Sequence, residues 1–295
     1  MQLLDLHLGK PLTRGALTIF PVWNGLAVER PAHDLCRPRL TVSERAGSPV
    51  VAELVVHNGG ARPVVVFEGE LLEGGHQHRV AARTVVVPAG EALVLDVRCV
   101  EQGRWGTGPD RHVPCGRRAP LGVRSRSGRS QGEVWSEVAR LEQRYGDSPT
   151  SSLLDVTADA ADAAARLVAG IAPLPFQTGL LVGIAGHPLL LEVFDCPRSL
   201  AAAWPALLQA AALDAVALDV ACRAPAPVSP QPTPGRRARR FLERLSGASP
   251  YQRREAGLGV QTSAAAPHTD VSVVTLYDAL VHAVAVNRRH ELVAA

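Results

Sequence analysis

The chain has 295 residues, enough for one large domain or two of ordinary size, and 46% of them are hydrophobic. Aromatic residues make up only 4%, so we expect a core built mostly from Val, Leu and Ala. The formal net charge of +3 is too small to indicate a protein that binds nucleic acid or a membrane surface. No apolar run approaches the ~18 residues that a membrane-spanning helix needs.

Cysteine usage and the start of the chain bear on the compartment. Five cysteines are scattered without CxxC spacing, at Cys36, Cys99, Cys115, Cys196 and Cys222. This pattern argues against a disulfide framework and for a reducing environment. Residues 1–12 lack the basic region and long apolar core of a signal peptide. We therefore expect a soluble cytoplasmic protein without membrane association, and nothing in the sequence specifies its oligomeric state.

The first 105 residues read as a succession of short strands. Residues 16–22, 39–44, 50–57 and 63–67 are rich in β-branched residues, with turn signals between them. Two more apolar runs, 83–88 and 92–97, flank Pro88-Ala89-Gly90-Glu91, a pattern typical of a β-hairpin. This spacing predicts a β-rich region over 1–105, with a sandwich- or barrel-like sheet.

Residues 106–130 have a different character. They contain several arginines, with Gly and Pro throughout and no apolar periodicity, so a long Arg-rich loop is predicted. Ser130 and Glu133 then match a capping box. Apolar residues follow at helical spacing, which predicts an amphipathic helix over 131–145.

The rest of the chain mixes helices with hairpins. Helices are predicted over 153–168, 197–213 and 236–246, and a Pro-rich segment over 224–234 predicts an extended linker. Hairpins are predicted for 179–194 and 271–286. The fold class is thus α+β: a β-rich N-terminal half followed by helices and β-hairpins. Residues 131–295 form an α+β region, either separate from the first region or continuous with it.

Two polar signatures frame the predicted hairpin of residues 83–97. The first includes Glu68, Glu70, Glu73, Gln77 and Arg79, and the second includes Cys99, Glu101, Arg104 and Trp105. We expect the hairpin to bring the two signatures together and to form a site there.

These signatures resemble those of a bacterial family, the ADP-ribosylglycohydrolase-and-rhodanese-phosphatase-superfamily-associated domain. The family form is close to GExLxGAKQNR followed by SCVExGRW, and the resemblance covers nearly the whole chain. His76 stands where the family usually has Lys, and His78 where it has Asn. The family name implies a role near nucleotide-derived metabolites such as ADP-ribose.

The residue types allow several chemistries. Glu70 or Glu101 could act as a general base while Arg79 and Arg104 hold a phosphate, with Glu68 and Gln77 as further ligand contacts. The alternative is a structural ion-pair network. Cys99 is a candidate nucleophile, because nearby arginines favour a thiolate, or else a small buried residue. Trp105 could stack on a base, or else anchor the core.

Other residues bear on metal and nucleic-acid ligands. His76 and His78 are two residues apart, so on a strand they would share a face and could bind a divalent metal with Glu70 or Glu73. The alternative is a pair of exposed loop histidines. No GxGxxG or GxxxxGK[ST] motif occurs. The Arg-rich loop lacks interleaved aromatic residues, which disfavours binding of single-stranded nucleic acid.

The sequence is therefore compatible with three functions. The first is binding or processing of an ADP-ribose-like small molecule at a Glu/Arg/Trp site. The second is a metal-assisted hydrolase in which a glutamate activates water. The third is a non-enzymatic interaction protein in which the signatures are architecture.

Overall fold

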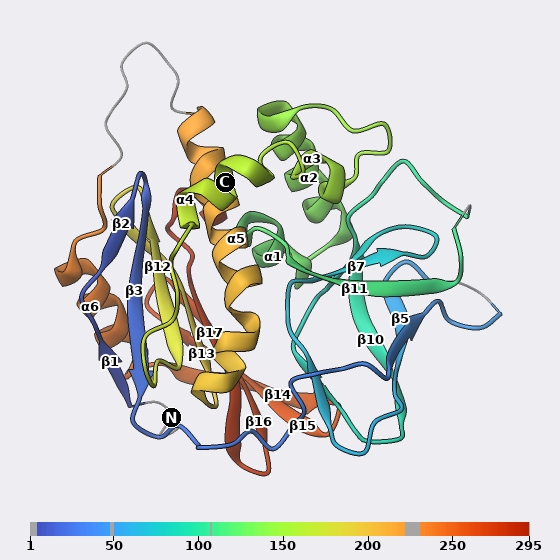
Figure 1. The fold of residues 1–295 in the computed structure, drawn as a ribbon, viewed down its shortest axis with the longest axis horizontal. Helices are drawn as coiled ribbons and strands as arrows, with labels where there is room; N and C mark the ends of the chain where they lie inside the picture. Colours follow the sequence, from blue (N-terminus) through green and yellow to red (C-terminus); the bar gives the residue numbers. More distant parts are fainter. Residues whose placement is uncertain (1–4, 48–49, 107, 222–230, 295) are drawn as a thin grey trace. The chain divides into compact units, whose positions relative to one another are not determined.

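A computed structural model describes residues 5–47, 50–106, 108–221 and 231–294 (Figure 1). The chain forms two compact units: unit 1 comprises Met1–Ala32 and Leu167–Ala295, and unit 2 comprises His33–Arg166. Unit 2 is therefore inserted between the two segments of unit 1. These units divide the chain differently from the predicted ranges 1–105, 106–130 and 131–295, because residues near the N-terminus pair with strands beyond residue 178.

Unit 1 is built on one antiparallel sheet. Its strands are β1 (Leu6–Leu8), β2 (Leu12–Arg14), β3 (Leu17–Asn24), β12 (Gly179–Ile184), β13 (His187–Phe194), β14 (Ser249–Ala256), β15 (Gly259–Ala266), β16 (Thr269–Leu276) and β17 (Ala279–Asn287). The sheet order is β1-β3-β12-β13-β17-β16-β15-β14, and β2 also pairs with β3. The predicted hairpins correspond to β12–β13 and β16–β17 and are confirmed. Strands β14 and β15 were not predicted, because their small and polar residues give no clear alternation.

Two helices cover opposite faces of this sheet (Figure 1). Helix α6 (Gly235–Leu245) buries Ala238, Phe241 and Leu245 in a core shared with β3, β12, β13 and the C-terminal strands. Helix α5 (Pro197–Ala221) packs on β3, β12 and β13. The short helix α7 (Glu291–Ala294) ends the described part of unit 1. The α6 prediction is confirmed, and most of the predicted Pro-rich linker lies outside the described residues.

Helix α5 differs from the sequence-based expectation in length and in apolar character. It continues well beyond the predicted end at residue 213, with Pro205 inside it. Residues Pro197–Leu218 are long and apolar enough, with a mean hydropathy of 1.5, to cross a membrane by length and composition alone. This corrects the expectation that no such segment exists. In this protein 61% of the apolar window is buried, and core helices of soluble proteins pass the same test.

Unit 2 contains a closed six-stranded barrel. Its strands are β4 (Leu40–Ser43), β5 (Glu53–Asn58), β7 (Glu70–Gly74), β8 (Arg79–Ala81), β10 (Ala92–Cys99) and β11 (Arg111–Arg118). They close in the order β10-β5-β4-β11-β7-β8. A separate pair joins β6 (Val64–Val66) to β9 (Val85–Val87). Buried valines and leucines of both sets fill one core, so the predicted barrel-like β-rich region is confirmed.

The predicted hairpin of residues 83–97 is wrong. Strand β9 pairs with β6, whereas β10 pairs with β5 and β8. The reason lies in Asn58, at the end of β5. Its buried side-chain amide donates to the carbonyls of Arg62, Val87 and Pro88, and its backbone carbonyl accepts from the Gly90 N–H. The turn is thereby bound to β5, and the two runs that it connects join different sheets.

The predicted Arg-rich loop is also wrong, because residues 106–130 contain β11 and helix α1 (Leu121–Ser127). Several of its arginines are buried and hydrogen-bonded rather than solvated. Arg126, for example, donates to the Gly122 carbonyl (2.8 Å) and lies 3.4 Å from the Glu137 carboxylate. Sequence patterns treat arginine as a surface residue, so this segment gives no helical or strand signal.

Helix α2 (Gln131–Tyr145) confirms the predicted bounds and the capping box. The Ser130 hydroxyl accepts from the Glu133 N–H, and the Glu133 carboxylate accepts from the Ser130 N–H. The helix predicted over 153–168 is instead two short helices, α3 (Leu153–Val156) and α4 (Ala161–Val168).

Candidate functional site

A polar layer closes one end of the unit 2 barrel. Along each strand alternate side chains face the interior, and at most levels these are apolar residues such as Val42, Leu72 and Val97. At this end the same alternation places four polar or ionisable side chains inside. They are Glu44, Arg79, Cys99 and His112, all of them buried. Strand register brings them together, since Arg79 is paired with Cys99, and His112 with Val42 and Gly74.

Glu44 is the centre of this layer. Its Oε1 accepts a hydrogen bond from the His76 N–H (3.1 Å), and it lies 3.1 Å from His112 Nε2 and 4.0 Å from Arg79 Nη2. Arg79 donates from Nη1 to the Gln77 carbonyl (2.9 Å). Burial lowers the pKa of both the Arg79 guanidinium and the His112 imidazole, although Glu44 opposes the effect in each case.

Four buried polar atoms of this layer remain unused. Within the described residues, Arg79 Nε and Nη2, Glu44 Oε2 and His112 Nδ1 have no hydrogen-bond partner. Folded proteins rarely leave buried polar atoms unpaired, so such atoms point to a bound water or ligand. The side chain of Arg79 is 0% exposed, which means that its free N–H groups face the interior of the protein.

Glu101 and Arg104 form a bidentate ion pair just outside the polar layer. Arg104 Nε and Nη2 donate to the two carboxylate oxygens at 2.8 and 2.7 Å. The same carboxylate accepts from the His78 N–H (2.9 Å) and the Thr150 hydroxyl (3.0 Å), while Arg104 Nη1 donates to the Gly75 carbonyl (2.8 Å). The pair therefore ties the 75–78 turn and residue 150 to the end of β10.

These contacts bear on the predicted catalytic role of Glu101. Burial alone would raise the pKa of its carboxyl, but hydrogen bonds from Arg104, the His78 N–H and Thr150 outweigh burial and lower it. A carboxylate with a lowered pKa and this many donors is a weak general base. The geometry therefore favours the structural alternative for Glu101 and Arg104.

Cys99 is held as a buried thiol. Helix α2 fixes its backbone, because the Gln131 amide donates to the Cys99 carbonyl (2.7 Å) and accepts from the Cys99 N–H (2.8 Å). Burial raises the pKa of the thiol, although the Glu101 N–H and Arg79 oppose the effect. The thiolate expected from nearby arginines is thus not supported, and a nucleophilic role for Cys99 stays a prediction without a favourable environment.

His76 and His78 lie in the turn between β7 and β8, and not on a strand. His78 Nδ1 accepts from the Gly74 N–H (3.0 Å), while the His76 ring lies 5.6 Å from the Trp105 ring and its Nε2 lies 3.8 Å from Asp110 Oδ1. No cluster of three or more His, Cys, Asp or Glu side chains able to hold a metal occurs among the described residues.

Glu68 and Glu70 belong to another part of the barrel. Glu70 begins β7, four residues and roughly 13 Å along the strand from the Gly74 end. Its carboxylate binds Arg37 Nη1 at 2.9 and 3.1 Å and accepts from the Phe67 N–H. The Glu68 carboxylate lies 3.4 Å from Arg124 Nη2. The expectation that Glu68 and Glu70 face Glu101 is therefore wrong, whereas Gln77 and Arg79 do meet Cys99, Glu101 and Arg104.

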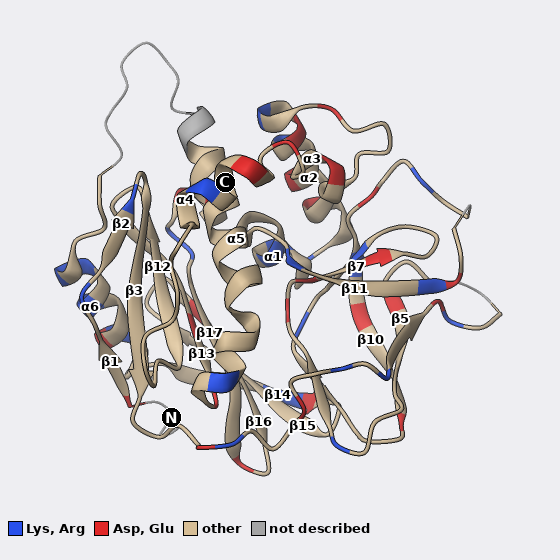
Figure 2. Cartoon of the chain, viewed as in Figure 1, with Lys and Arg blue, Asp and Glu red and all other residues tan. Residues whose placement is uncertain are grey.

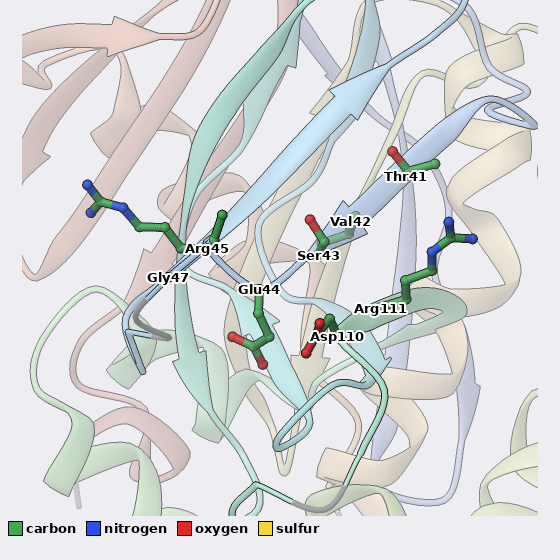
Figure 3. Close-up of a pocket in the computed structure, with 9 residues that line it drawn as sticks. Thr41, Val42, Ser43, Glu44, Arg45, Gly47, Asp110 and Arg111 are labelled. Atoms are coloured by element: carbon green, nitrogen blue, oxygen red, sulfur yellow. The ribbon is translucent and has the colours of Figure 1, made fainter.

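A pocket of about 590 Å³ opens beside the polar layer (Figure 3). Its lining comes from the end of β4, the residues after it and the start of β11: Thr41, Val42, Ser43, Glu44, Arg45, Ala46, Gly47, Asp110 and Arg111. Figure 3 shows the carboxylates of Glu44 and Asp110 close to each other, with Arg45 and Arg111 on either side. A mixed acidic and basic lining suits a ligand that carries both hydroxyl and phosphate groups.

A comparison with known protein families covers nearly the whole chain. The model of the ARG and Rhodanese-Phosphatase-superfamily-associated Protein domain, ARPP-1, matches residues 5–286. The chain belongs to the ARPP-1 family. Comparisons with curated proteins and with solved structures give no match.

Most residues of the two signatures gather at one end of the inserted barrel, whereas Glu68 and Glu70 lie near the other end of β7. Sequence reasoning found Gln77, Arg79, Cys99, Glu101 and Arg104, and the predicted stacking residue Trp105 lies next to them, with its side chain half exposed. It missed a second set of residues because these are distant in the sequence and carry no motif of their own: Glu44, Asp110, His112, Gln131 and Thr150. The only available signal was Glu44, a charged residue that continues an alternating strand pattern.

Proposed function

We propose that unit 2 of this ARPP-1 protein binds a nucleotide-derived small molecule of the ADP-ribose type at the Glu44–Asp110–Arg111 pocket. The observation that carries the proposal is the presence of unpaired buried atoms of Arg79 and Glu44 beside a pocket of about 590 Å³. Volumes of this size are typical of small-molecule sites. A pocket of the same size without unpaired buried polar atoms beside it would not support the proposal.

The charged residues of the pocket suit different parts of such a ligand. Arg111 is exposed at the side of the pocket and presents a guanidinium fork, which binds phosphate oxygens in a bidentate manner, whereas the Arg45 guanidinium pairs with Glu53 (2.8 Å). Asp110 and Glu44 supply carboxylate oxygens, which accept hydrogen bonds from ribose hydroxyls. We assign the phosphates to Arg111 and the ribose to Asp110.

The base is assigned to Trp105. Its indole is 53% exposed, which is unusual for a large aromatic side chain with no solvent-facing role. The His76 ring lies 5.6 Å from it and also neighbours Asp110, so the platform is continuous with the pocket. A base stacked on tryptophan contributes about 1–3 kcal/mol in comparable sites.

Glu101 and Arg104 take a positioning role in this proposal. They hold the 75–78 turn, which carries His76 and supplies the backbone N–H that binds Glu44. Loss of the pair would displace the turn and weaken binding indirectly. This assignment supports a binding protein rather than a glutamate-based hydrolase.

Isothermal titration calorimetry with ADP-ribose, AMP and ribose 5-phosphate tests the proposal. Wild type should bind ADP-ribose most tightly, Arg111→Gln should weaken every phosphate-containing ligand, and Trp105→Ala should weaken ADP-ribose and AMP but not ribose 5-phosphate. Arg129→Gln removes an exposed arginine that lies outside the pocket and serves as the matched control. Absence of heat with all three ligands, or equal losses in Arg129→Gln and Arg111→Gln, would refute the site.

A further inference from the structure

Helix α6 carries a dense basic surface on unit 1. Its eleven residues contain one acid, Glu243, and five arginines. The arginines are Arg236, Arg237, Arg239, Arg240 and Arg244, and all of them are exposed. Ala238, Phe241 and Leu245 are buried on the side of the helix that faces the sheet, so the exposed side presents guanidinium groups. Figure 2 shows basic residues concentrated on α6.

The basic surface continues beyond the end of α6. Partial burial and the charges of Arg289, Arg244 and Arg288 lower the pKa of His268, which identifies these four side chains as electrostatic neighbours. His268 lies in the β15–β16 turn, and Arg288 and Arg289 follow β17. Asp270 offsets part of this charge, since its carboxylate lies 3.4 Å from Arg288 Nε.

The charge balance of the two units differs. Unit 1 contains 14 Lys and Arg against 11 Asp and Glu, whereas unit 2 contains 17 of each. The whole net charge of +3 therefore belongs to unit 1. Within it, residues 235–256 contain seven arginines and two glutamates. The small net charge of the whole chain thus coexists with a local concentration of arginines in residues 235–256.

The position of these arginines within α6 is electrostatically unfavourable. The first turn contains arginines and no acid, although the N-terminal end of a helix repels positive charge. The arrangement costs stability in the free protein, and a bound polyanion would offset that cost. This electrostatic cost does not identify the class of polyanion. The spacing of the arginines identifies it.

We propose that the α6 surface binds the phosphate backbone of a nucleic-acid duplex. Arg236, Arg240 and Arg244 recur every four residues, so they form a stripe with steps of about 6 Å and a length of about 12 Å. Duplex DNA carries one negative charge per ~1.7 Å of axis, so the stripe meets about seven phosphate charges. Backbone contacts of this kind position a protein without reading sequence.

Other polyanions fit the surface less well. Insertion into a membrane needs an exposed apolar helix face, but Ala238, Phe241 and Leu245 are buried. Binding of single strands relies on aromatic side chains that stack on bases, and the single aromatic residue of α6, Phe241, is part of the core. An acidic protein is the alternative partner, and polyglutamate represents it in the experiment.

The test is fluorescence anisotropy of the full chain with a labelled 20-base-pair duplex over a salt series. Wild type should bind, and the logarithm of its association constant should fall linearly with the logarithm of salt concentration. The variant Arg236→Gln/Arg240→Gln/Arg244→Gln should bind at least about tenfold more weakly at low salt, and its salt slope should be smaller by about 2–3. Circular dichroism checks that each variant is folded.

The matched control is Arg39→Gln/Arg129→Gln/Arg166→Gln, which removes the same charge from exposed positions of unit 2 outside the pocket. It should retain wild-type affinity and slope. Equal losses in both triple variants would overturn the proposal in favour of total charge. Tighter binding to single strands, to anionic phosphatidylserine vesicles or to polyglutamate, or no duplex binding at 50 mM salt, would overturn it as well.

Discussion

Replacement of Arg104 by alanine tests whether the Glu101–Arg104 pair is architecture. The Glu101 side chain is 4% exposed and Arg104 is 22% exposed. Removal of one partner from a buried pair leaves an uncompensated charge and typically costs 3–5 kcal/mol. Arg104 is partly solvated and Glu101 keeps the His78 N–H and Thr150 donors, so we expect a loss of about 2–3 kcal/mol in the free energy of unfolding at pH 7.

The loss should depend on pH in a defined direction. The pKa of Glu101 is lowered in the folded wild type, so its stabilising contribution is present above the unfolded-state pKa of ~4.3 and is lost as pH falls through the lowered value. Without Arg104, burial is opposed by fewer hydrogen bonds, and the folded-state pKa of Glu101 rises. The variant can then protonate Glu101, and the stability difference from wild type should shrink between pH 7 and pH 5.

Urea unfolding followed by circular dichroism at both pH values measures these differences. Glu101→Gln/Arg104→Ala should be more stable at pH 7 than Arg104→Ala alone, because no buried charge remains. Arg45→Ala disrupts an exposed ion pair on the same barrel, with Glu53 at 2.8 Å, and should cost less than about 1 kcal/mol. An Arg104→Ala protein as stable as Arg45→Ala, or a difference that grows at pH 5, would refute the reasoning.

Three further outcomes are expected. Ser130→Ala removes the capping hydroxyl of α2 and should cost about 1 kcal/mol in urea unfolding, and an unchanged stability would contradict the capping box. Gly75→Ala should lower the melting temperature strongly in a thermal scan. Gly75 has φ +57°, and a new Cβ would lie 2.0 Å from the His112 ring. Gly90→Ala is the milder control, because there is open space around Gly90. In native protein at pH 8, iodoacetamide should modify exposed Cys36 well before Cys99, as read by peptide mass spectrometry; comparable rates would show that Cys99 is accessible.

Local patterns predicted the elements that depend on neighbours in sequence. The α2 helix follows from Ser130, Glu133 and an apolar stripe, and the β12–β13 hairpin follows from two apolar runs around Gly186. The predictions were wrong where contacts between residues distant in the sequence determine the local structure. Asn58 redirects the turn at Pro88–Glu91, and buried arginines such as Arg126 pair with acids on other elements.

The site was predictable in part for the same reason. Gln77, Arg79, Glu101 and Arg104 lie close together because the short strand β8 pairs with β10. Glu70 belongs to the first signature but lies at the start of β7, at the opposite end from Gly74. The length of this five-residue strand separates Glu70 from the site. Glu44 and Asp110 meet at the pocket only because β4 and β11 pair when the barrel closes. Hydrophobic periodicity in the sequence does not predict this pairing.

The insertion of unit 2 into unit 1 has a consequence for the order of events during synthesis. Strand β3 must wait for β12, which is translated about 150 residues later, before it gains its main partner. All barrel strands of unit 2 lie between residues 40 and 118 and are complete on a growing chain by then. Loop closure over long separations slows folding. A nascent chain should therefore acquire the barrel first, while residues 17–24 can pair only with β1 and β2 and the edge that β12 later covers stays open.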